Sequence, residues 1–394
     1  SPAGAVEGCA LLPGCVRNGG GGASAVAPCP GPSSATLMGR TSFGLGVVLS
    51  ELFVGCIFQL EAWLRGDTQP FERATLCSDG RLVPELYLLG VEKSASKSFA
   101  KGLLRAGARR ICRTRDDTEC HFFDRFLAHL AGRQQRAEWL RGLPDCPLPW
   151  STKQVAIDPT PSYFSLLPLP SGSTCSGGHW GQFNEVGNVS TVDMHLPRAL
   201  HSIYGKDKAK RLTFVLLLRD PFARMQSSWI MSSQWKFQAM CIDCRGPTFS
   251  TDLNRTLHLA VRTPPVYEDW LWHSLYAHHL AMWLAHFDAR QFYFVPFSHY
   301  TRKDKSAGCA DLTVRLGFTF NCTRMRESIG HRNRNPPHEI VAPELRARFN
   351  ELMSSEAVRL ADLLAKAHAG GAGLSGYTGQ SEATQVLAWL EAGW

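Results

Sequence analysis

Residues 90–99, GVEKSASKSF, place two lysines and three serines between an apolar run and a helix-like segment. Backbone N–H groups at such a strand-to-helix loop point towards one place, and the helix dipole there favours negative charge. The stretch therefore predicts a site for a phosphate or a similar anion, formed by Gly90, Lys93, Ser94, Ala95, Ser96, Lys97 and Ser98. A solvated turn with two lysines is the alternative for this stretch taken alone.

A Walker A loop is one candidate for this site, because Lys97-Ser98 repeats its lysine–hydroxyl pair. However, Val91 and Ser96 stand where that loop needs the glycines that let its backbone wrap phosphates. Lys93, three residues after Gly90, would form a tighter cradle of another kind. The spacing thus leaves a nucleoside-triphosphate loop and a different anion loop as alternatives.

A second candidate element begins at Arg219, which follows the most apolar run of the chain, LTFVLLL. Asp220 suits a helix N-cap and Pro221 suits the first helical position. Ser227 would then lie about two turns into that helix. An arginine at the end of a strand and a hydroxyl on the next helix can bind one phosphate from two sides.

A third element, ECHFFD at residues 119–124, sets two aromatic residues among ionisable ones. With Phe122 and Phe123 in the core, Glu119 and His121 would project along the same side of an extended stretch. A carboxylate beside a histidine can act as a general base. A salt-bridged surface pair is the alternative.

The elements that must position these residues alternate between strand and helix. Buried strands are expected at 85–89, 155–158, 212–218 and 291–295, and helices at 98–106, 196–204, from 220 onward, at 267–287 and at 343–368. Buried strands separated by helices indicate an α/β fold, with a central parallel β-sheet covered by helices on both faces. Residues 165–193 and 238–265 are expected to be irregular insertions.

Composition narrows the choice of partners. The chain has 394 residues and a net charge of +8, which favours an anionic partner, yet it contains no dense Lys/Arg block or nucleic-acid-binding signature. Cys241 and Cys244 form a C-x-x-C pair without a second pair, so we expect no metal site. The other cysteines cannot be paired from sequence.

The first 82 residues differ from the rest. Residues 1–36 are rich in Gly, Pro, Ala and Ser and are expected to be disordered. Residues 43–60 form an apolar run of nearly membrane-spanning length, a candidate signal-anchor with a buried core helix as the alternative. Sequons at Asn188, Asn254 and Asn321 are consistent with a glycoprotein of the secretory route.

The order of these motifs resembles the PAPS-dependent Golgi carbohydrate sulfotransferases, where PAPS is 3′-phosphoadenosine 5′-phosphosulfate. It runs from the G-x-x-K loop through E-x-H-F-F-D, D-x-T-P-S-Y-F and R-D-P-x-x-R to Ser227. The similarity is greatest to the heparan sulfate glucosamine 3-O-sulfotransferases and the N-sulfotransferase domain. It spans residues 83–394 and implies a single sulfotransferase domain with a P-loop-like sulfotransferase fold.

The resemblance also implies roles. Residues 90–98 would cradle the phosphosulfate, with Lys93 at the leaving phosphate, while Arg219 and Ser227 would hold the 3′-phosphate. Glu119 would be the catalytic base, assisted by His121. Asp124 and Asp158 would lie with them at the acceptor site. A late loop with Gly330, His331 and Arg332 would also contact the cofactor. Ala95 stands where the family commonly has glycine.

The implied reaction is sulfuryl transfer from PAPS to a hydroxyl, or less readily an amine, of a carbohydrate acceptor, without a metal. The implied location is the Golgi membrane, with type II topology. Two rival functions remain: a nucleoside-triphosphate-dependent kinase and a non-catalytic binder of acidic polysaccharide. The sequence leaves the acceptor and the oligomeric state open.

Overall fold

The computed structural model describes residues 74–111, 119–123, 132–148, 151–165, 196–234, 246–262, 269–303, 306, 308–326 and 338–393. All of them belong to one compact unit, Gly55–Trp394; a second unit, Ser1–Val54, has no described residue. The predicted disordered region, the candidate anchor at 43–60, Cys241, Cys244 and Asn188 lie outside the described residues.

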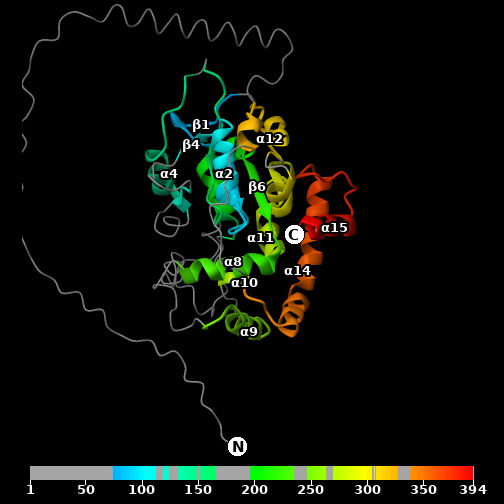
Figure 1. Ribbon diagram of the computed structural model, residues 1–394. Coiled ribbons are helices and arrows are strands. Elements are labelled where there is room, and N and C mark those ends of the chain that lie inside the picture. The colour runs from blue at the N-terminus through cyan, green and yellow to red at the C-terminus, as the bar shows by residue number, and fades with distance from the viewer. Residues whose placement is uncertain are drawn as a thin grey trace, which may run out of the picture. The chain divides into compact units, whose positions relative to one another are not determined.

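A parallel sheet of six strands forms the centre of this unit (Figure 1). Its spatial order is β4-β5-β3-β6-β7-β8, and every adjacent pair is parallel. The strands are β3 (Pro84–Gly90), β4 (Arg109–Arg110), β5 (Ala156–Asp158), β6 (Thr213–Leu218), β7 (Phe292–Pro296) and β8 (Gly373–Leu374). A short antiparallel pair, β1 (Cys77–Ser78) and β2 (Arg81–Leu82), precedes them. The strand order switches sides at β3, with β4 and β5 on one side and β6, β7 and β8 on the other. Ligands commonly bind at such a switch point, beyond the carboxyl ends of the strands.

Both faces of the sheet are buried. Alternate residues of β3 enter different hydrophobic clusters: Tyr87 and Leu89 belong to one, Leu86 and Leu88 to the other. Helices α6, α11, α14 and α15 contribute to the first cluster, and α2, α12 and α13 to the second. The predicted α/β architecture, a parallel sheet with helices on both faces, is confirmed.

Helices surround the sheet, and those expected at 98–106, 196–204, from 220 onward and at 343–368 are present. The helices are α2 (Ser96–Arg105), α4 (Gly132–Arg141), α6 (Leu196–Tyr204), α7 (Lys206–Ala209), α8 (Pro221–Gln234), α9 (Phe249–Ala260), α10 (Asp269–Trp272), α11 (Tyr276–Leu284), α12 (Cys309–Leu316), α13 (Cys322–Arg326), α14 (Pro343–Ala369) and α15 (Ala383–Gly393). Short helical turns occupy η1 (Tyr163–Ser165), η4 (Ala289–Gln291) and η5 (His299–Lys303).

Helix α9 corrects one expectation, because it lies inside the stretch 238–265 that was predicted to be irregular. The Thr248 side chain caps the helix by accepting a hydrogen bond from the backbone N–H of Thr251. Leu253 and Leu257, one turn apart, pack in a third hydrophobic cluster with residues of α8 and α14. Serine, threonine and asparagine give this segment weak helix propensity, so tertiary packing decides its structure.

A second correction concerns the stretch 267–287, which was predicted to form one long helix. It forms α10 and α11 instead, with a break at residues 273–275. At the break the Ser274 hydroxyl donates to the Trp270 carbonyl oxygen, and the buried Arg224 of α8 contacts both groups. Helix-like hydrophobic spacing could not reveal this side-chain insertion from another element.

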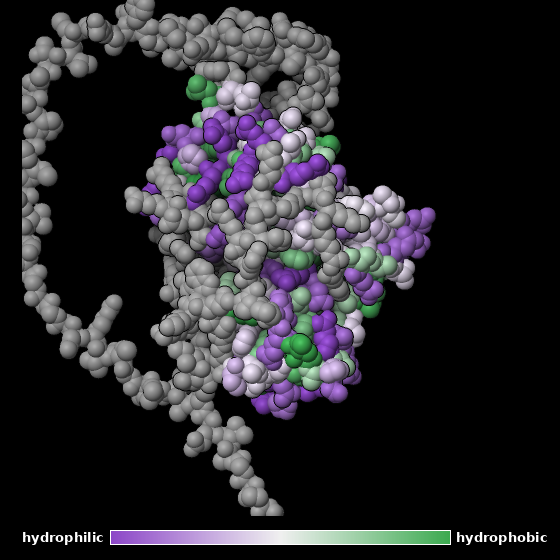
Figure 2. All heavy atoms as spheres, viewed as in Figure 1, coloured by the Kyte–Doolittle hydropathy of each residue, from purple (hydrophilic) through white to green (hydrophobic). Residues whose placement is uncertain are grey.

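Two disulfides join parts of the described chain, Cys77–Cys146 and Cys309–Cys322. Within the described ranges, none of the helices combines the length and the hydropathy that a bilayer span requires. On the face seen in Figure 2, the described surface is largely hydrophilic, with small separate hydrophobic patches.

Candidate functional site

The loop after β3 is shaped by a close approach at Gly90. A Cβ atom at this position would lie 2.6 Å from the Pro161 carbonyl oxygen and 3.2 Å from Cβ of Phe164. Its φ of +154° also lies in the range that side chains with a Cβ disfavour. Gly90 therefore lets the strand end pass against the segment that follows β5.

The rest of the loop turns back on itself before α2 begins. Lys93 has φ +67°, and Ala95, the residue before the helix, has φ +63°, both in the left-handed region. No side chain caps the start of α2. The positive end of the helix is therefore directed at the loop, and the N-cap residue Ala95 offers no side-chain hydrogen bond to its first N–H groups.

Ser94 gives an independent indication that the loop holds a ligand. Its side chain is 0% exposed, and its Oγ has no hydrogen-bond partner among the residues that the structure describes. Buried hydroxyl groups in proteins are nearly always hydrogen-bonded, and an exception often marks a functional site. The donor and acceptor capacity of Ser94 therefore fits a polar ligand in this loop.

Lys93, the lysine that was expected at the leaving phosphate, lies half-buried in the loop. Its Nζ donates to the thioether Sδ of Met231, 3.2 Å away on α8. Burial lowers the pKa of Lys93, and the negative charges of Glu92 and Glu119 oppose this shift only in part. A lysine that donates to a neutral sulfur keeps its full positive charge available to an anion.

Arg219 lies against the same loop. Its Nη1 donates to the carbonyl oxygen of Lys93 at 2.6 Å, and its guanidinium lies 4.7 Å from the ring centre of Phe297. Burial is the main cause that lowers the pKa of Arg219. Within the described parts of the chain, neither Lys93 nor Arg219 forms an ion pair with a carboxylate, so the loop carries excess positive charge.

Helix α8 starts as the sequence predicts. Asp220 caps it, since its Oδ1 accepts from the backbone N–H of Ala223 at 2.6 Å, and Pro221 is the first helical residue. Ser227 is 2% exposed, one turn before Met231. Residues four apart share a helix face, so Ser227 lies on the face that carries the contact to Lys93.

Arg224 is a functional candidate whose role sequence reasoning missed, although it ends the R-D-P-x-x-R motif. It is 0% exposed, and its Nε donates to Ser274 Oγ at 2.8 Å. A second nitrogen donates to the carbonyl oxygen of Trp270. Its charge lowers the pKa of Lys93, as does that of Arg219. Arg224 thus holds α8 to the break between α10 and α11.

Glu119 and His121 meet as a pair, with 2.8 Å between Oε2 and Nε2. Their side chains are 18% and 25% exposed, so both reach the surface. The stretch between them is not extended as expected, because His121 has φ +50°. The two side chains nevertheless lie on one side, and Phe123 is buried in the core as predicted.

A set of hydrogen bonds from the D-x-T-P-S-Y-F segment positions this pair. Thr160 Oγ1 accepts from the backbone N–H groups of Cys120 and His121, at 3.0 and 3.1 Å. The Tyr163 hydroxyl accepts in the same way from the two residues that follow, at 3.0 and 3.2 Å. Thr160 and Tyr163 therefore position the Glu119–His121 pair. Both belong to the D-x-T-P-S-Y-F motif, but the sequence did not indicate this role.

Asp158, which was expected at the acceptor site, ends strand β5. It is 1% exposed, and its Oδ1 accepts from the Thr160 hydroxyl at 2.7 Å. Asp158 therefore orients the Thr160 hydroxyl, which in turn binds the backbone of the Glu119–His121 segment.

The remaining predicted residues are placed as follows. Ser96 is buried, Ser98 is half-buried and Lys97 is exposed at the start of α2. Asp124, Gly330, His331 and Arg332 lie outside the described residues. No group of three or more potential metal ligands occurs among the residues that can be placed. The site therefore consists of a cationic loop, Arg219 just before α8, and a carboxylate–histidine pair whose carboxylate charge acts on Lys93.

Comparisons with known proteins find similarity among solved structures. No protein-family model matches the chain, and no curated protein matches it. A crystal structure of a sulfotransferase from Alicyclobacillus acidocaldarius is similar, with 15% identity and a TM-score of 0.44. The match covers 72% of this chain and 96% of that one. A similarity of this size does not assign an activity to this chain.

Proposed function

We propose that the protein transfers a sulfuryl group from PAPS to a hydroxyl group of a carbohydrate acceptor. The observation that carries the proposal is the loop itself: among the described residues no carboxylate pairs with Lys93 or Arg219, and no residue hydrogen-bonds the buried Ser94 hydroxyl beside them. These groups fit a phosphosulfate, which offers several anionic oxygens to donors and a cation. PAPS would supply the activated sulfuryl group.

The residues around the loop suit an in-line displacement. Glu119 would accept the proton of the acceptor hydroxyl as its oxygen forms a bond to sulfur. The bond between sulfur and the bridging phosphate oxygen breaks in the same step. Lys93 and the N–H groups at the start of α2 would stabilise the charge that grows on the departing phosphate. His121 would hold the Glu119 carboxylate in its orientation.

Two residues suit the second phosphate of the nucleotide. Arg219 lies against the loop, and Ser227 is buried on the face of α8 that turns towards it. Arg224 would keep α8 in register with the loop through its contacts to Ser274 and Trp270. We also propose that Gly330, His331 and Arg332 contact the nucleotide, as the family resemblance implies.

A kinase is less well supported. It needs an acidic residue at a strand end to hold a magnesium–nucleotide complex. Asp158, the acid at such an end, is buried and accepts a hydrogen bond from Thr160. The backbone at Val91 and Ser96 also lacks the glycines of a Walker loop.

We propose further that the protein works in the secretory pathway, at the Golgi membrane, held by residues 43–60. The disulfides Cys77–Cys146 and Cys309–Cys322 favour an oxidising compartment. Of the sequon asparagines, Asn254 and Asn321 are exposed.

A labelled-sulfate transfer screen tests the proposed activity. Purified protein would be incubated with labelled PAPS and a panel of polysaccharides, oligosaccharides and small hydroxylated metabolites. We expect transfer to at least one carbohydrate, and strongly reduced transfer by Arg219→Ala. Salt-sensitive polysaccharide binding without transfer would support a non-catalytic binder instead. Preferential binding of ATP–magnesium over adenosine 3′,5′-bisphosphate would support a kinase.

A further inference from the structure

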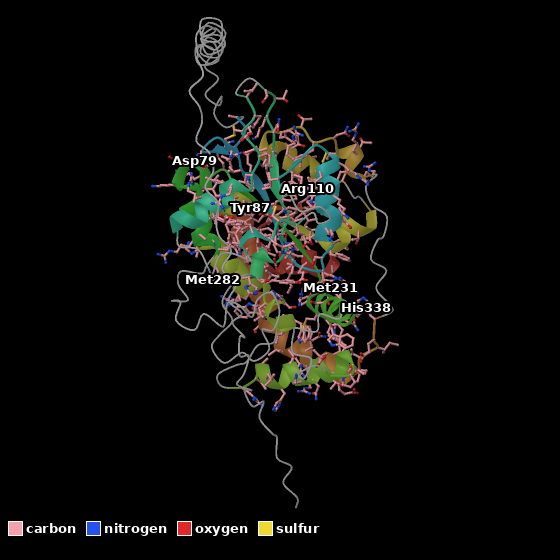
Figure 3. The ribbon with its side chains drawn as sticks, turned by 90° about the vertical axis from the view of Figure 1, so that its left-hand side faces the viewer. Asp79, Tyr87, Arg110, Met231, Met282 and His338 are labelled. Carbon is pink, nitrogen blue, oxygen red and sulfur yellow. A yellow bond between two sulfur atoms is a disulfide. The ribbon has the colours of Figure 1, made fainter. Side chains whose placement is uncertain are left out.

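Lys93 is held at both of its ends, by the residue just before α8 and by a residue in the last turn of that helix. Its carbonyl oxygen accepts from Nη1 of Arg219 at 2.6 Å, and its Nζ donates to Sδ of Met231 at 3.2 Å. Within the described residues, the contact to Met231 is the one hydrogen bond of the ammonium group. Figure 3 labels Met231 on α8.

The sulfur of Met231 is a neutral and weak acceptor for a half-buried ammonium group. A carboxylate at this place would cancel the charge of Lys93, and an amide oxygen would bind it more firmly. A phosphate oxygen is a charged acceptor, and hydrogen bonds to charged acceptors are about twice as strong as neutral ones. The contact therefore directs the ammonium group while leaving it easy for an anion to take over.

We propose that Met231 is a positioning residue for Lys93, whose weak sulfur acceptor holds the ammonium group at the loop and yields it to an incoming phosphosulfate. The inference rests on the proposed function, because it takes the ligand to be PAPS. The acceptor strength at position 231 then determines how strongly the protein itself competes with the nucleotide for Lys93. A stronger acceptor should weaken nucleotide binding.

The pH dependence of nucleotide binding reports on this contact. Burial lowers the pKa of Lys93, and the charges of Arg219 and Arg224 lower it further. The charges of Glu92 and Glu119 act in the opposite direction. All four groups stay in place when residue 231 is changed, whereas the acceptor of the ammonium group does not. A stronger acceptor raises the pKa of the lysine and loss of the acceptor lowers it, and anion affinity falls as the pH rises through that value.

Calorimetric titration with adenosine 3′,5′-bisphosphate from about pH 7 to about pH 10 tests the inference. Met231→Leu keeps the volume of the side chain but removes the acceptor, so the alkaline loss of affinity should begin about half a pH unit lower than in the wild type. Met231→Gln supplies an amide oxygen, so this loss should begin about half a pH unit higher, and the affinity at neutral pH should fall about fivefold. A general loosening of α8 would not shift the two profiles in opposite directions.

Two controls connect these effects to Lys93. In the Lys93→Met background, Met231→Gln should no longer change the affinity, because the two residues act through one contact. Met282→Gln alters a half-buried methionine on α11, which Figure 3 shows apart from Met231. It should leave the affinity and its pH dependence as in the wild type.

The outcomes separate this inference from the proposed function. If the wild type binds the bisphosphate and Arg219→Ala does not, while both Met231 variants keep the wild-type affinity and pH profile, the role of Met231 is wrong and the proposed function stands. Shifts in the same direction, or effects that persist in the Lys93→Met background, would make Met231 a structural residue only. If the wild type binds no bisphosphate, the proposed function and this inference both fail.

Discussion

The two ends of strand β3 handle charge in opposite ways. Near its start, Glu85 accepts from Lys153 at 3.2 Å and from Arg211 at 3.1 Å, so one carboxylate meets two cations. At its far end, Lys93 contacts a thioether, and Arg219 contacts a carbonyl oxygen and an aromatic ring. One end is a closed ion cluster, while the other is a cationic loop with neutral partners.

This difference indicates which end of β3 stabilises its own charges and which end needs a bound anion to do so. Burial raises the pKa of Glu85, but the charges of Lys153 and Arg211 oppose the shift, as expected of a cluster that stabilises itself. At the loop, burial lowers the pKa of Lys93, and the charges of Glu92 and Glu119 oppose this shift, although among the described residues neither forms an ion pair with its ammonium group. A charge left without a partner is disfavoured in the empty site and becomes favourable when an anion binds.

The largest effect is expected at the acid beside the loop. Glu119→Gln should lower turnover by about 10²–10⁴-fold, because it removes the group that accepts the acceptor proton. Binding of adenosine 3′,5′-bisphosphate should change little. The measurement is initial-rate kinetics with the acceptor that the transfer screen identifies.

Glu92→Gln is the matched control, since Glu92 also raises the pKa of Lys93 but forms no pair with His121. It removes the same charge near the loop without removing the base. An equal loss of turnover in both variants would contradict the role of Glu119 as a base and would assign the effect to charge alone.

Lys93→Met comes next. Removing one charged group that stabilises the departing phosphate should lower kcat/KM by about 10²–10³-fold. The free energy of unfolding should stay the same or rise slightly, because a partly buried charge is lost. In the wild type, activity should decline on the alkaline side below pH 10.5, the ordinary lysine value, since burial lowers the pKa of Lys93. If Lys93→Met instead lowers the unfolding free energy and leaves kcat/KM unchanged, Lys93 is a structural residue and the proposed contrast between the two ends of β3 is wrong.

A lysine-to-methionine substitution at the start of β3 should lower stability and leave the kinetics unchanged, the opposite of Lys93→Met. Lys153→Met leaves Glu85 with one cation and should cost about 3 kcal/mol of unfolding free energy at neutral pH, with the kinetics of the folded enzyme unchanged. Losing Lys153 raises the pKa of Glu85 further, so the native state takes up a proton at higher pH. The stability loss should therefore shrink as the pH falls through that raised value.

Chemical denaturation at pH 5 and pH 7 measures this effect. Lys210→Met is the control, because Lys210 and Asp207 form an exposed pair 3.8 Å apart. Removing an exposed pair should cost at most about 1 kcal/mol. Equal losses in the two variants would mean that the cluster at Glu85 contributes no more than a surface pair.

The central strands could be predicted because they are largely apolar runs, whereas the short edge strands β4 and β8 could not. The run LTFVLLL is the buried strand β6, and helices 196–204 and 343–368 agree with α6 and α14 to within a residue or two. Predictions failed where contacts between distant segments decide the structure. Helix α9 depends on packing against α8 and α14, and the break after α10 depends on Arg224.

The site follows the same rule. Residue type and spacing pointed to Lys93, Arg219 and the Glu119–His121 pair, because charge and strand ends are visible in the sequence. Met231 could not be found in this way, since a methionine on a helix carries no chemical signal. Its role comes only from the segment that the fold brings against α8.

The smallest effect concerns Ala95, where the resemblance leads one to expect glycine. Its φ of +63° lies in the left-handed region, which costs a residue with a Cβ about 1–2 kcal/mol. Ala95→Gly removes that strain but also the contact of its methyl group with the core and some rigidity of the unfolded chain. We expect a net gain of about 0.5 kcal/mol in unfolding free energy, with activity unchanged.

Ala347→Gly makes this prediction decisive, because Ala347 is exposed in the ordinary helical region of α14. There the same change should cost about 1 kcal/mol. Opposite signs in thermal or denaturant unfolding would mean that the backbone of the loop, rather than the alanine side chain, determines the shape of the cradle. A loss at both positions would mean that Ala95 is not strained, and that its methyl contact outweighs the left-handed conformation.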